Sequence, residues 1–253
     1  MKTTIVEMHK IAQYLAAFNL SFLPQVPDDS HSNLEWKGLS NSLVSRVTRV
    51  EQVQLGFNVL SAELFILKSG NYFSKLALQE NVHKSILTWI ATSLKEAGIE
   101  QEYRYAFHYD LPYESFADNT AFYYDTIKAE QITQLWTLAF DVFKRFLGNY
   151  QLESEIRIWP HHFDMGVYTA IRKADNLYMG AGLALPDMLV DAMYYYATSW
   201  YNNKAVVTAK FKKKDIGHWR KDWNGAVLDA TNVKEKELEA FLAESMMAFL
   251  DYH

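Results

Sequence analysis

The chain has 253 residues, and its 30 acidic residues outnumber its 25 lysines and arginines, which gives a formal net charge of −5. Proteins that bind the phosphate backbone of nucleic acids are usually basic, so this charge balance argues against nucleic-acid binding. The sequence contains no cysteine, which excludes disulfide frameworks, thiolate zinc sites, iron–sulfur clusters and cysteine nucleophiles.

The aromatic content is high, with 16 Tyr, 15 Phe and 7 Trp. Tyrosine and tryptophan bury an apolar ring and keep a polar tip for a partner, so they suit a ligand pocket and a sheet core equally well. No apolar run approaches the roughly 20 residues that a membrane helix needs, and no signal-peptide pattern opens the chain. We expect a soluble, cytoplasmic protein that binds neither membranes nor nucleic acids.

The first half of the chain is expected to contain a helix, a run of strands and two further helices. Apolar spacing predicts helices over residues 5–18, 82–97 and 132–147, and strands over 43–50, 53–60, 63–68, 72–78 and 103–109. Short connections between the strands predict an antiparallel meander. An aromatic loop is expected over residues 111–124.

The second half repeats this order of strands followed by a helix. Strands are predicted over residues 156–159, 165–171, 177–185, 193–200, 205–211 and 226–228, and an amphipathic helix over 238–250. The run Lys212-Lys213-Lys214 is interpreted as solvated charge.

Runs of strands followed by helices are typical of an α+β fold, so we expect antiparallel, twisted sheets with helices packed on them. The chain is interpreted as one compact unit over residues 1–253, with two similarly ordered halves at 1–150 and 151–253. Gly180-Ala181-Gly182 lacks the third glycine of a dinucleotide-binding loop, and no helix start follows it. A Rossmann or P-loop nucleotide site is therefore not expected.

The densest group of chemically active residues is Trp159-Pro160-His161-His162-Phe163-Asp164. It follows a predicted strand, and because Pro160 has no N–H, this strand should lie at a sheet edge or end at the proline. If the extended conformation continued, every second residue would share a face, with His162 beside Asp164 and His161 on the opposite face.

The two histidines and the aspartate, His161, His162 and Asp164, are candidate ligands of a divalent metal ion. His162 and Asp164 form the natural pair, and a third ligand would come from elsewhere in the chain. The candidates for it are His31, His108, His218, Asp187 and Asp191. Alternatively, one histidine is a hydrogen-bonded core residue and Asp164 caps a turn or orients an imidazole. The pair could also act as a general base, but no Gly-x-Ser-x-Gly nucleophile motif accompanies it.

Later segments are expected to complete an aromatic pocket beside this motif. Glycine inside a strand often lets another backbone or a ligand come close, and acidic and aromatic residues follow the glycines in this sequence. The residues predicted to bind a ligand are Trp159, His161, His162, Asp164, Gly182, Asp187, Tyr194, Tyr196 and Trp223. Alternatively, Asp187 is an ordinary turn cap and the aromatic residues only pair across the strands.

The same segments carry a resemblance to a known family. In chain order they are Trp159 to Asp164, Gly180-Ala181-Gly182-Leu183 through Pro186-Asp187, Tyr194-Tyr195-Tyr196, and Trp223-Asn224-Gly225-Ala226-Val227-Leu228. In this order residues 154–250 resemble a family of uncharacterised bacterial domains, marked by the Trp-Pro-His-His-Phe-Asp motif and a C-terminal Trp-x-Gly-Ala-Val-Leu segment. The resemblance implies that the scattered segments belong to one fold, and it implies no activity.

Three interpretations of function follow. We expect a small-molecule-binding domain with an aromatic pocket near residues 159–164. The first alternative is a metal-assisted hydrolase, in which His162, Asp164 and a distant histidine hold a divalent ion that activates water. The second alternative is a structural protein that forms homo-oligomers and uses its aromatic residues for packing only.

Overall fold

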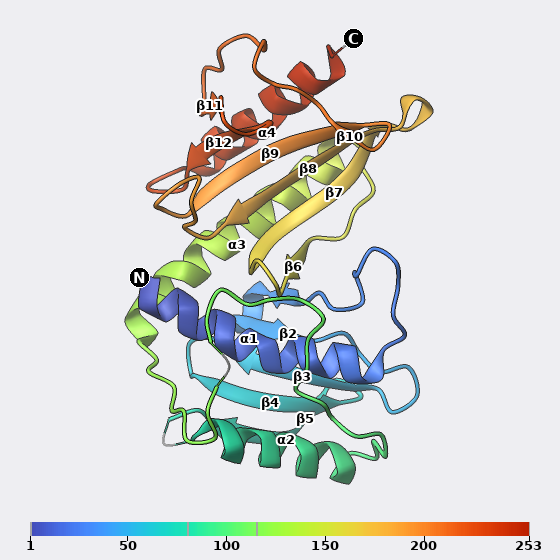
Figure 1. Cartoon of the computed structure of the whole chain (residues 1–253), viewed down its shortest axis with the longest axis vertical. Helices are drawn as coiled ribbons and strands as arrows, with labels where there is room; N and C mark the ends of the chain where they lie inside the picture. Colours follow the sequence, from blue (N-terminus) through green and yellow to red (C-terminus); the bar gives the residue numbers. More distant parts are fainter. Residues whose placement is uncertain (1, 80, 115, 253) are drawn as a thin grey trace. The chain divides into compact units, whose positions relative to one another are not determined.

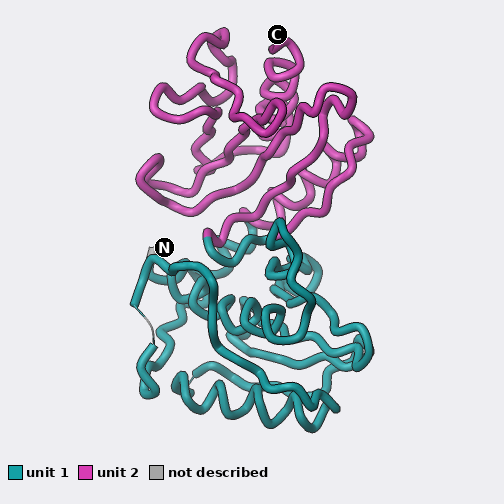
Figure 2. The backbone as a smooth tube through the Cα atoms, turned by 45° about the vertical axis from the view of Figure 1, so that its right-hand side comes forward, with its two compact units in different colours: residues 1–134, 158–161 teal, residues 135–157, 162–253 magenta. Residues whose placement is uncertain are grey.

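The computed structural model describes residues 2–79, 81–114 and 116–252. In this part of the chain, four α-helices and two antiparallel sheets of five and seven strands form an α+β fold (Figure 1). The prediction of an α+β fold with antiparallel sheets is confirmed. The chain divides into two compact units: unit 1 comprises residues 1–134 and 158–161, and unit 2 comprises residues 135–157 and 162–253 (Figure 2).

Unit 1 is built from a five-stranded meander and its helices. Its elements are α1 (Lys2–Phe22), β1 (Glu35–Lys37), β2 (Ser42–Val44), β3 (Val53–Asn58), β4 (Glu63–Lys68), β5 (Asn71–Ala77), α2 (His83–Glu96) and the first part of α3 (Thr126–Asn149). The strand order is β1-β2-β3-β4-β5, and each neighbouring pair is antiparallel. Chain order and spatial order therefore agree, as the short connections predicted.

Helix α1 forms much of the core of unit 1. Its apolar residues are buried, among them Ile5, Met8, Ile11, Leu15 and Phe18. Polar side chains on other sides of the same helix are buried as well: Thr4, Glu7, His9, Gln13 and Asn19. A helix enclosed in this way has to satisfy its polar groups with protein partners, because water does not reach them.

One of these partners is the segment 103–109, for which the strand prediction was wrong. The segment has no sheet neighbours, but its odd-numbered residues are half-buried and its even-numbered residues are exposed. The Tyr103 hydroxyl donates to the carbonyl oxygen of Tyr14 at 3.0 Å, and the Tyr109 hydroxyl donates to Gln13 Oε1 at 2.9 Å. The two-residue period therefore reflects burial against α1, not pairing with another strand.

Unit 2 is a second sheet with two helices. Its elements are the remainder of α3, β7 (Asp164–Arg172), β8 (Leu177–Ala184), β9 (Tyr194–Tyr201), β10 (Lys204–Ala205), β11 (His218–Trp219), β12 (Gly225–Asp229), α4 (Glu235–Leu250) and the start of β6 (Arg157–Trp159). The strand order is β11-β12-β9-β8-β7-β6, and β10 pairs with β9. As predicted, β6 is at the end of the order and stops before Pro160. The strand expected over residues 205–211 was wrong, because the pairing ends at Ala205.

The two faces of the second sheet differ. Helix α4 packs on β7, β8 and β9 (Figure 1), and the side chains of the covered face are buried: Met165, Val167, Met179, Ala181, Leu183, Tyr195 and Ala197. The alternate residues of the same strands form the other face, which we call the open face. Its side chains include Asp164, Tyr168, Tyr178, Tyr196 and Trp200, all partly or largely exposed.

The third lysine of the run predicted to be solvated, Lys214, is buried, and for this residue the prediction was wrong. Its Nζ donates to Ser245 Oγ at 2.9 Å and lies 3.3 Å from Glu244 Oε2. The rings of Trp219 and Phe241 lie about its ammonium group, with centroids at 5.1 and 4.9 Å. Burial lowers the pKa of Lys214, while Glu244 acts in the opposite direction. The side chain ties the 206–217 loop to α4.

We expect Tyr195→Phe to stabilise the protein. Tyr195 is fully buried on the covered face, and its hydroxyl has no hydrogen-bond partner among the described residues. An unpaired buried hydroxyl costs roughly 1–3 kcal/mol, so its removal should raise the free energy of unfolding by about 1 kcal/mol. Urea unfolding of the two proteins measures the difference. A variant less stable than the parent chain would mean that the hydroxyl is bonded in the folded state.

Candidate functional site

The predicted motif leaves its strand at Pro160. Ile158 is paired with Leu34 through two reciprocal backbone hydrogen bonds, each 2.9 Å long. Residues 160–163 then form a turn in which Phe163 has a left-handed φ of 57°. The side chains of the motif therefore do not alternate between two faces, as they would in a continued strand.

Helix α1 holds the proline of the motif. The carbonyl oxygen of Pro160 accepts hydrogen bonds from His9 Nε2 at 2.7 Å and from Gln13 Nε2 at 2.8 Å. Because a carbonyl oxygen only accepts, His9 carries a ring proton on Nε2. The two donors are buried side chains of unit 1. Pro160 therefore has a structural role, which the sequence did not predict beyond the end of the strand.

The boundary between the units falls between the two histidines of the motif. Trp159 and His161 belong to unit 1, where their rings lie 6.1 Å apart and nearly perpendicular. The His161 ring lies 5.7 Å from that of Tyr109. His162 belongs to unit 2 and is exposed.

The second part of the motif leads into the open face. Phe163 is buried, and its ring meets Trp136 edge to face with centroids 5.1 Å apart. Asp164 begins β7, and its Oδ2 accepts a 2.6 Å hydrogen bond from the Tyr196 hydroxyl. Tyr196 lies on β9, so its side chain has to cross the intervening strand β8 to reach Asp164.

Two glycines allow this crossing. Gly182 of β8 lies in register between Tyr196 and Gly166 of β7. A Cβ on Gly182 would lie 2.5 Å from the Tyr196 hydroxyl oxygen, and one on Gly166 would lie 3.0 Å from the same atom. A close approach at Gly182 was expected, and the group that approaches is a tyrosine ring of the chain itself.

The environment of Asp164 alters its acidity. Although Asp164 is partly exposed as a residue, the surrounding protein desolvates its carboxyl and raises its pKa above the ordinary value, while the Tyr196 hydrogen bond and the nearby His162 act in the opposite direction. Burial and the adjacent carboxylate also raise the pKa of Tyr196 well above the usual range. Tyr196 therefore remains a hydrogen-bond donor, and Asp164 keeps its proton to a higher pH than an exposed aspartate does.

Tyr194 of the same strand, β9, forms a second tyrosine–aspartate pair with Asp187 of the loop between β8 and β9. The Tyr194 hydroxyl donates to Asp187 Oδ2 at 2.7 Å. The other oxygen, Asp187 Oδ1, accepts from the backbone N–H groups of Leu189 and Val190 at 2.7 and 3.1 Å. Asp187 thus caps a turn, as the alternative prediction for this residue stated. Its carboxylate also binds the hydroxyl of Tyr194 on β9.

Aromatic rings continue along the open face. Trp223 meets Tyr196 at a centroid distance of 6.4 Å and an interplanar angle of 76°. Farther along the strands, Tyr168 and Tyr178 stack in parallel at 5.2 Å, and Trp200 meets Tyr168 at 5.6 Å. Tyr168 and Tyr178 were not among the predicted site residues. Their even-numbered spacing from Asp164 and Gly182 placed them on this face and could have identified them.

Seven of the nine residues predicted to bind a ligand lie in unit 2. They are His162, Asp164, Gly182, Asp187, Tyr194, Tyr196 and Trp223. Contacts with Tyr196 link Asp164, Gly182 and Trp223, and electrostatic interactions extend from Asp164 to His162 and Tyr194. The remaining two, Trp159 and His161, lie in unit 1.

The described residues contain no set of side chains that could hold the predicted metal ion. Within residues 2–79, 81–114 and 116–252, no group of three or more histidine, aspartate or glutamate side chains is placed to hold an ion. His162 and Asp164 interact electrostatically, but no third side chain among the described residues completes a site around them.

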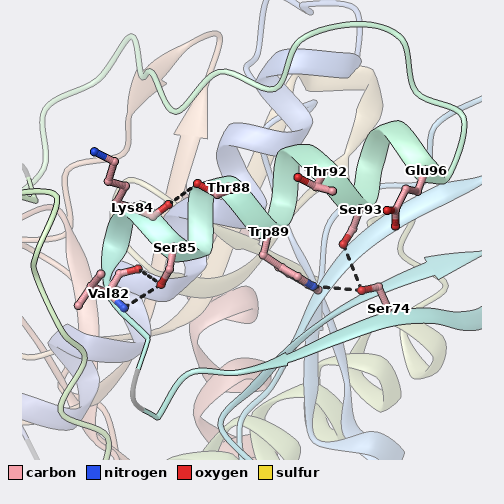
Figure 3. A pocket seen from close by; sticks show the side chains of 9 residues that line it. All are labelled: Ser74, Val82, Lys84, Ser85, Thr88, Trp89, Thr92, Ser93 and Glu96. Carbon is pink, nitrogen blue, oxygen red and sulfur yellow. Dashed lines mark hydrogen bonds between the residues drawn. The ribbon is translucent and has the colours of Figure 1, made fainter.

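A cavity of about 720 Å³ lies in unit 1 between α2 and β5 (Figure 3). Most of its lining residues carry hydroxyl groups: Ser74, Ser85, Thr88, Thr92 and Ser93. Val82, Lys84, Trp89 and Glu96 complete the lining. Trp89 Nε1 donates to Ser74 Oγ at 3.0 Å, and the hydroxyls of Ser74 and Ser93 are 3.1 Å apart. These polar groups are thus already paired with one another. The sequence did not indicate this cavity, because hydroxyl residues on a helix surface have no distinctive spacing.

Comparison of the chain with models of protein families, with curated proteins and with solved structures finds no match. The resemblance of residues 154–250 to uncharacterised bacterial domains stays a prediction. Within the described ranges, no helix combines the length and the apolar character needed to cross a bilayer. A function can therefore be proposed only from the geometry of the units.

We expect Gly182→Ala to disrupt the Tyr196–Asp164 pair. The new methyl group would lie 2.5 Å from the Tyr196 ring and 2.6 Å from the Met165 carbonyl oxygen, so the strand or the ring has to move. The free energy of unfolding should fall by about 1–3 kcal/mol or more. Gly148→Ala is the matched control, because nothing lies within 4 Å of a Cβ there; it should be neutral or stabilising by about 0.5–1 kcal/mol. Equal effects of the two changes in urea unfolding would contradict the steric argument.

The raised pKa of Asp164 predicts a pH-dependent stability. The folded chain binds this proton more tightly than the unfolded chain, so the stabilisation is greatest in acid and is lost as pH rises from about 4 through the raised pKa. Asp164→Asn removes the ionisation, and its stability relative to the parent chain should therefore rise between about pH 3.5 and pH 7. Parallel stability curves for the two proteins would refute this. Tyr196→Phe should show the opposite trend, because it removes a hydrogen bond that lowers the pKa of Asp164, and should cost about 1.5–3 kcal/mol at neutral pH.

Proposed function

We propose that this protein binds a small molecule on the open face of the second sheet, next to Asp164. The observation that carries the proposal is the hydrogen-bonded pair of Tyr196 and Asp164 beside partly exposed aromatic rings. The pair supplies an oriented carboxyl, and the rings supply an apolar surface. Ligand sites typically combine these two features.

The rings provide the apolar part of the site. Tyr168 is 50 % exposed, and four other rings of the site are partly exposed: Tyr178, Tyr196, Trp200 and Trp223. Exposed tyrosine and tryptophan rings stack on the flat faces of sugars and of other rings, and their positions are fixed here by neighbouring strands. A ligand with a ring-shaped apolar face suits this surface.

The carboxylates define the polar part of the ligand. Asp164 and Asp187 each accept a hydrogen bond from a tyrosine, and each ionised carboxylate offers several acceptor positions. Asp229 of β12 adds a further exposed carboxylate in register with Tyr194. Such a face favours ligands that donate hydrogen bonds and disfavours anions. We infer a neutral polyhydroxylated ring, such as a pyranose sugar, as the ligand class.

No specific observation favours the alternatives. The metal-assisted hydrolase lacks a grouped set of three ligand side chains among the described residues. The homo-oligomeric structural protein stays a prediction, because the aromatic face can serve either a ligand or a second chain.

Titration with sugars tests the proposal. Trp200 and Trp223 lie on the face, so a bound sugar should change the tryptophan fluorescence of the protein and raise its melting temperature. A panel of neutral mono- and oligosaccharides is titrated, with tyramine, a phenol that carries a cationic alkylamine, as a chemically different ligand. We expect saturable binding of at least one sugar, weakened about tenfold or more by Tyr168→Ala or Trp200→Ala.

Tyr150→Ala is the matched control, because Tyr150 is a 43 % exposed tyrosine of unit 2 that lies in the turn after α3 and on no strand of the sheet. This variant should bind as the parent chain does. Binding of tyramine but of no sugar would keep the site and change the ligand class. Failure of the whole panel, or equal binding by all variants, would exclude the open face as the site.

A further inference from the structure

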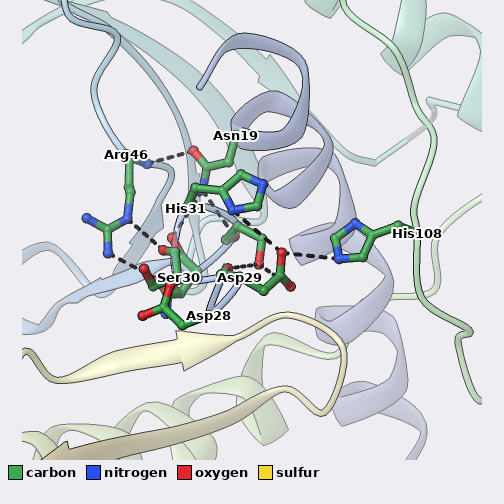
Figure 4. A network of polar contacts seen from close by, with 9 residues as sticks. Asn19, Asp28, Asp29, Ser30, His31, Arg46 and His108 are labelled. Carbon is green, nitrogen blue, oxygen red and sulfur yellow. Dashed lines mark hydrogen bonds and ion pairs between the residues drawn. The ribbon is translucent and has the colours of Figure 1, made fainter. Parts of the chain in front are cut away.

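A carboxylate in unit 1 lies between two histidines (Figure 4). Asp29 Oδ1 is 3.1 Å from His108 Nε2 and 3.5 Å from His31 Nδ1. The two imidazole rings are nearly parallel, with centroids 6.5 Å apart and an interplanar angle of 13°. The His31 side chain is 6 % exposed and that of His108 is 47 % exposed, so one histidine is enclosed and the other is in contact with solvent.

These contacts depend on charge more than on hydrogen bonding. Within the described residues, neither Asp29 Oδ1 nor His31 Nδ1 has a partner in hydrogen-bond geometry, although both lie within ion-pair distance. An attraction without good hydrogen-bond alignment is weak while the imidazoles are neutral. It becomes an ion pair when they are protonated, which for an ordinary histidine happens near pH 6.5.

The cluster joins two segments that run beside α1. Asp29 and His31 belong to the turn after α1, which Asn19 holds by donating to the carbonyl oxygens of Ser32 and Asn33 at 3.1 Å each. His108 belongs to the 103–109 segment, which has no sheet neighbours. Its backbone is held at Arg104, whose N–H donates to Ser21 Oγ at 2.9 Å and whose carbonyl oxygen accepts from the same hydroxyl at 3.2 Å. A segment outside the sheets is fastened by few such contacts, and one added ion pair therefore changes how firmly it is held.

We propose that Asp29, His31 and His108 form a proton-operated latch, which fastens the 103–109 segment to the turn after α1 at mildly acidic pH and releases it at higher pH. When both rings are protonated, the carboxylate holds two imidazolium ions. When the rings are neutral, the ion pairs are lost.

Neighbouring charges set the strength of the latch. Asp28 and Asp110 adjoin the cluster in sequence and add negative charge, which attracts imidazolium ions. Arg46, which donates to the carbonyl oxygen of Ser30, adds a positive charge on the turn and opposes protonation. The Tyr109 ring lies 5.2 Å from that of His108. The two imidazolium ions also repel each other, which weakens the latch.

A buried histidine outside the cluster, His83, lowers the stability of unit 1 in stronger acid. His83 accepts or donates a 2.7 Å hydrogen bond with the Tyr14 hydroxyl on α1. Burial lowers the pKa of His83, with Asp118 acting in the opposite direction. Its charging costs stability as pH falls below about 6.5 towards this lowered pKa. The acidic arm of the test of the latch is therefore confined to mildly acidic pH, where His83 costs the fold little.

Hydrogen–deuterium exchange of the full chain at about pH 5.8 and about pH 7.8 tests the latch. After correction for the chemical exchange rate, peptides covering residues 26–34 and 103–110 should exchange roughly two- to fivefold more slowly at the lower pH, the range that an exposed ion pair supplies. His108→Gln and Asp29→Asn should abolish this difference. Asparagine is suitable at position 29 because φ is 59° there, a conformation that asparagine tolerates.

His218→Gln is the control, because His218 is an exposed histidine of unit 2; it should keep the pH difference. Equal protection of the parent chain at the two pH values would overturn the proposal, as would a difference that persists in His108→Gln. If circular dichroism shows that Asp29→Asn does not fold, His108→Gln decides alone, since it changes an exposed side chain.

Discussion

The open face of the second sheet depends on one steric condition: β8 has glycine where rings of β9 pass across it. Tyr196 passes over Gly182 to reach Asp164 on β7. The ring of Trp200 lies over Gly180 of β8, where a Cβ would be 3.0 Å from the Cζ3 atom of Trp200. Rings that lie down on a sheet bury part of their own area and leave one face to solvent. The aromatic surface and the placed carboxyl are thus two results of the same packing arrangement.

Much of this arrangement could be predicted from strand parity. In a strand, residues two apart share a face, so Gly180 and Gly182 had to lie on one side of β8, and Tyr194 and Tyr196 on one side of β9. The antiparallel order followed from the short connections. Parity also grouped the acidic, glycine and aromatic residues of unit 2. It could not show that the ring of Tyr196 would fill the space above Gly182, because that depends on the register between strands.

The remaining differences have local physical causes. The turn at residues 160–163 separates the two histidines of the motif, and a left-handed Phe163 has no sequence signature, because glycine and asparagine usually occupy such positions. Burial does alternate over residues 103–109, but the alternation reflects packing against α1 and not pairing in a sheet. Lys214 is buried because two aromatic rings, a serine and Glu244 surround its ammonium group. In each case the deciding partner lies far away in sequence.

The hydrogen bonds from α1 to the Pro160 carbonyl oxygen have a consequence for folding during translation. His9 and Gln13 precede the carbonyl that they bind by 151 and 147 residues. A ribosome adds about 5–20 residues per second, so the N-terminal helix emerges roughly 7 to 30 seconds before this partner exists. During that interval neither donor has this acceptor, although Gln13 Nε2 can still donate to the His9 carbonyl oxygen in the same helix, at 3.2 Å in the folded chain. Unit 1 can therefore complete its native contacts only after translation has entered the second half of the message.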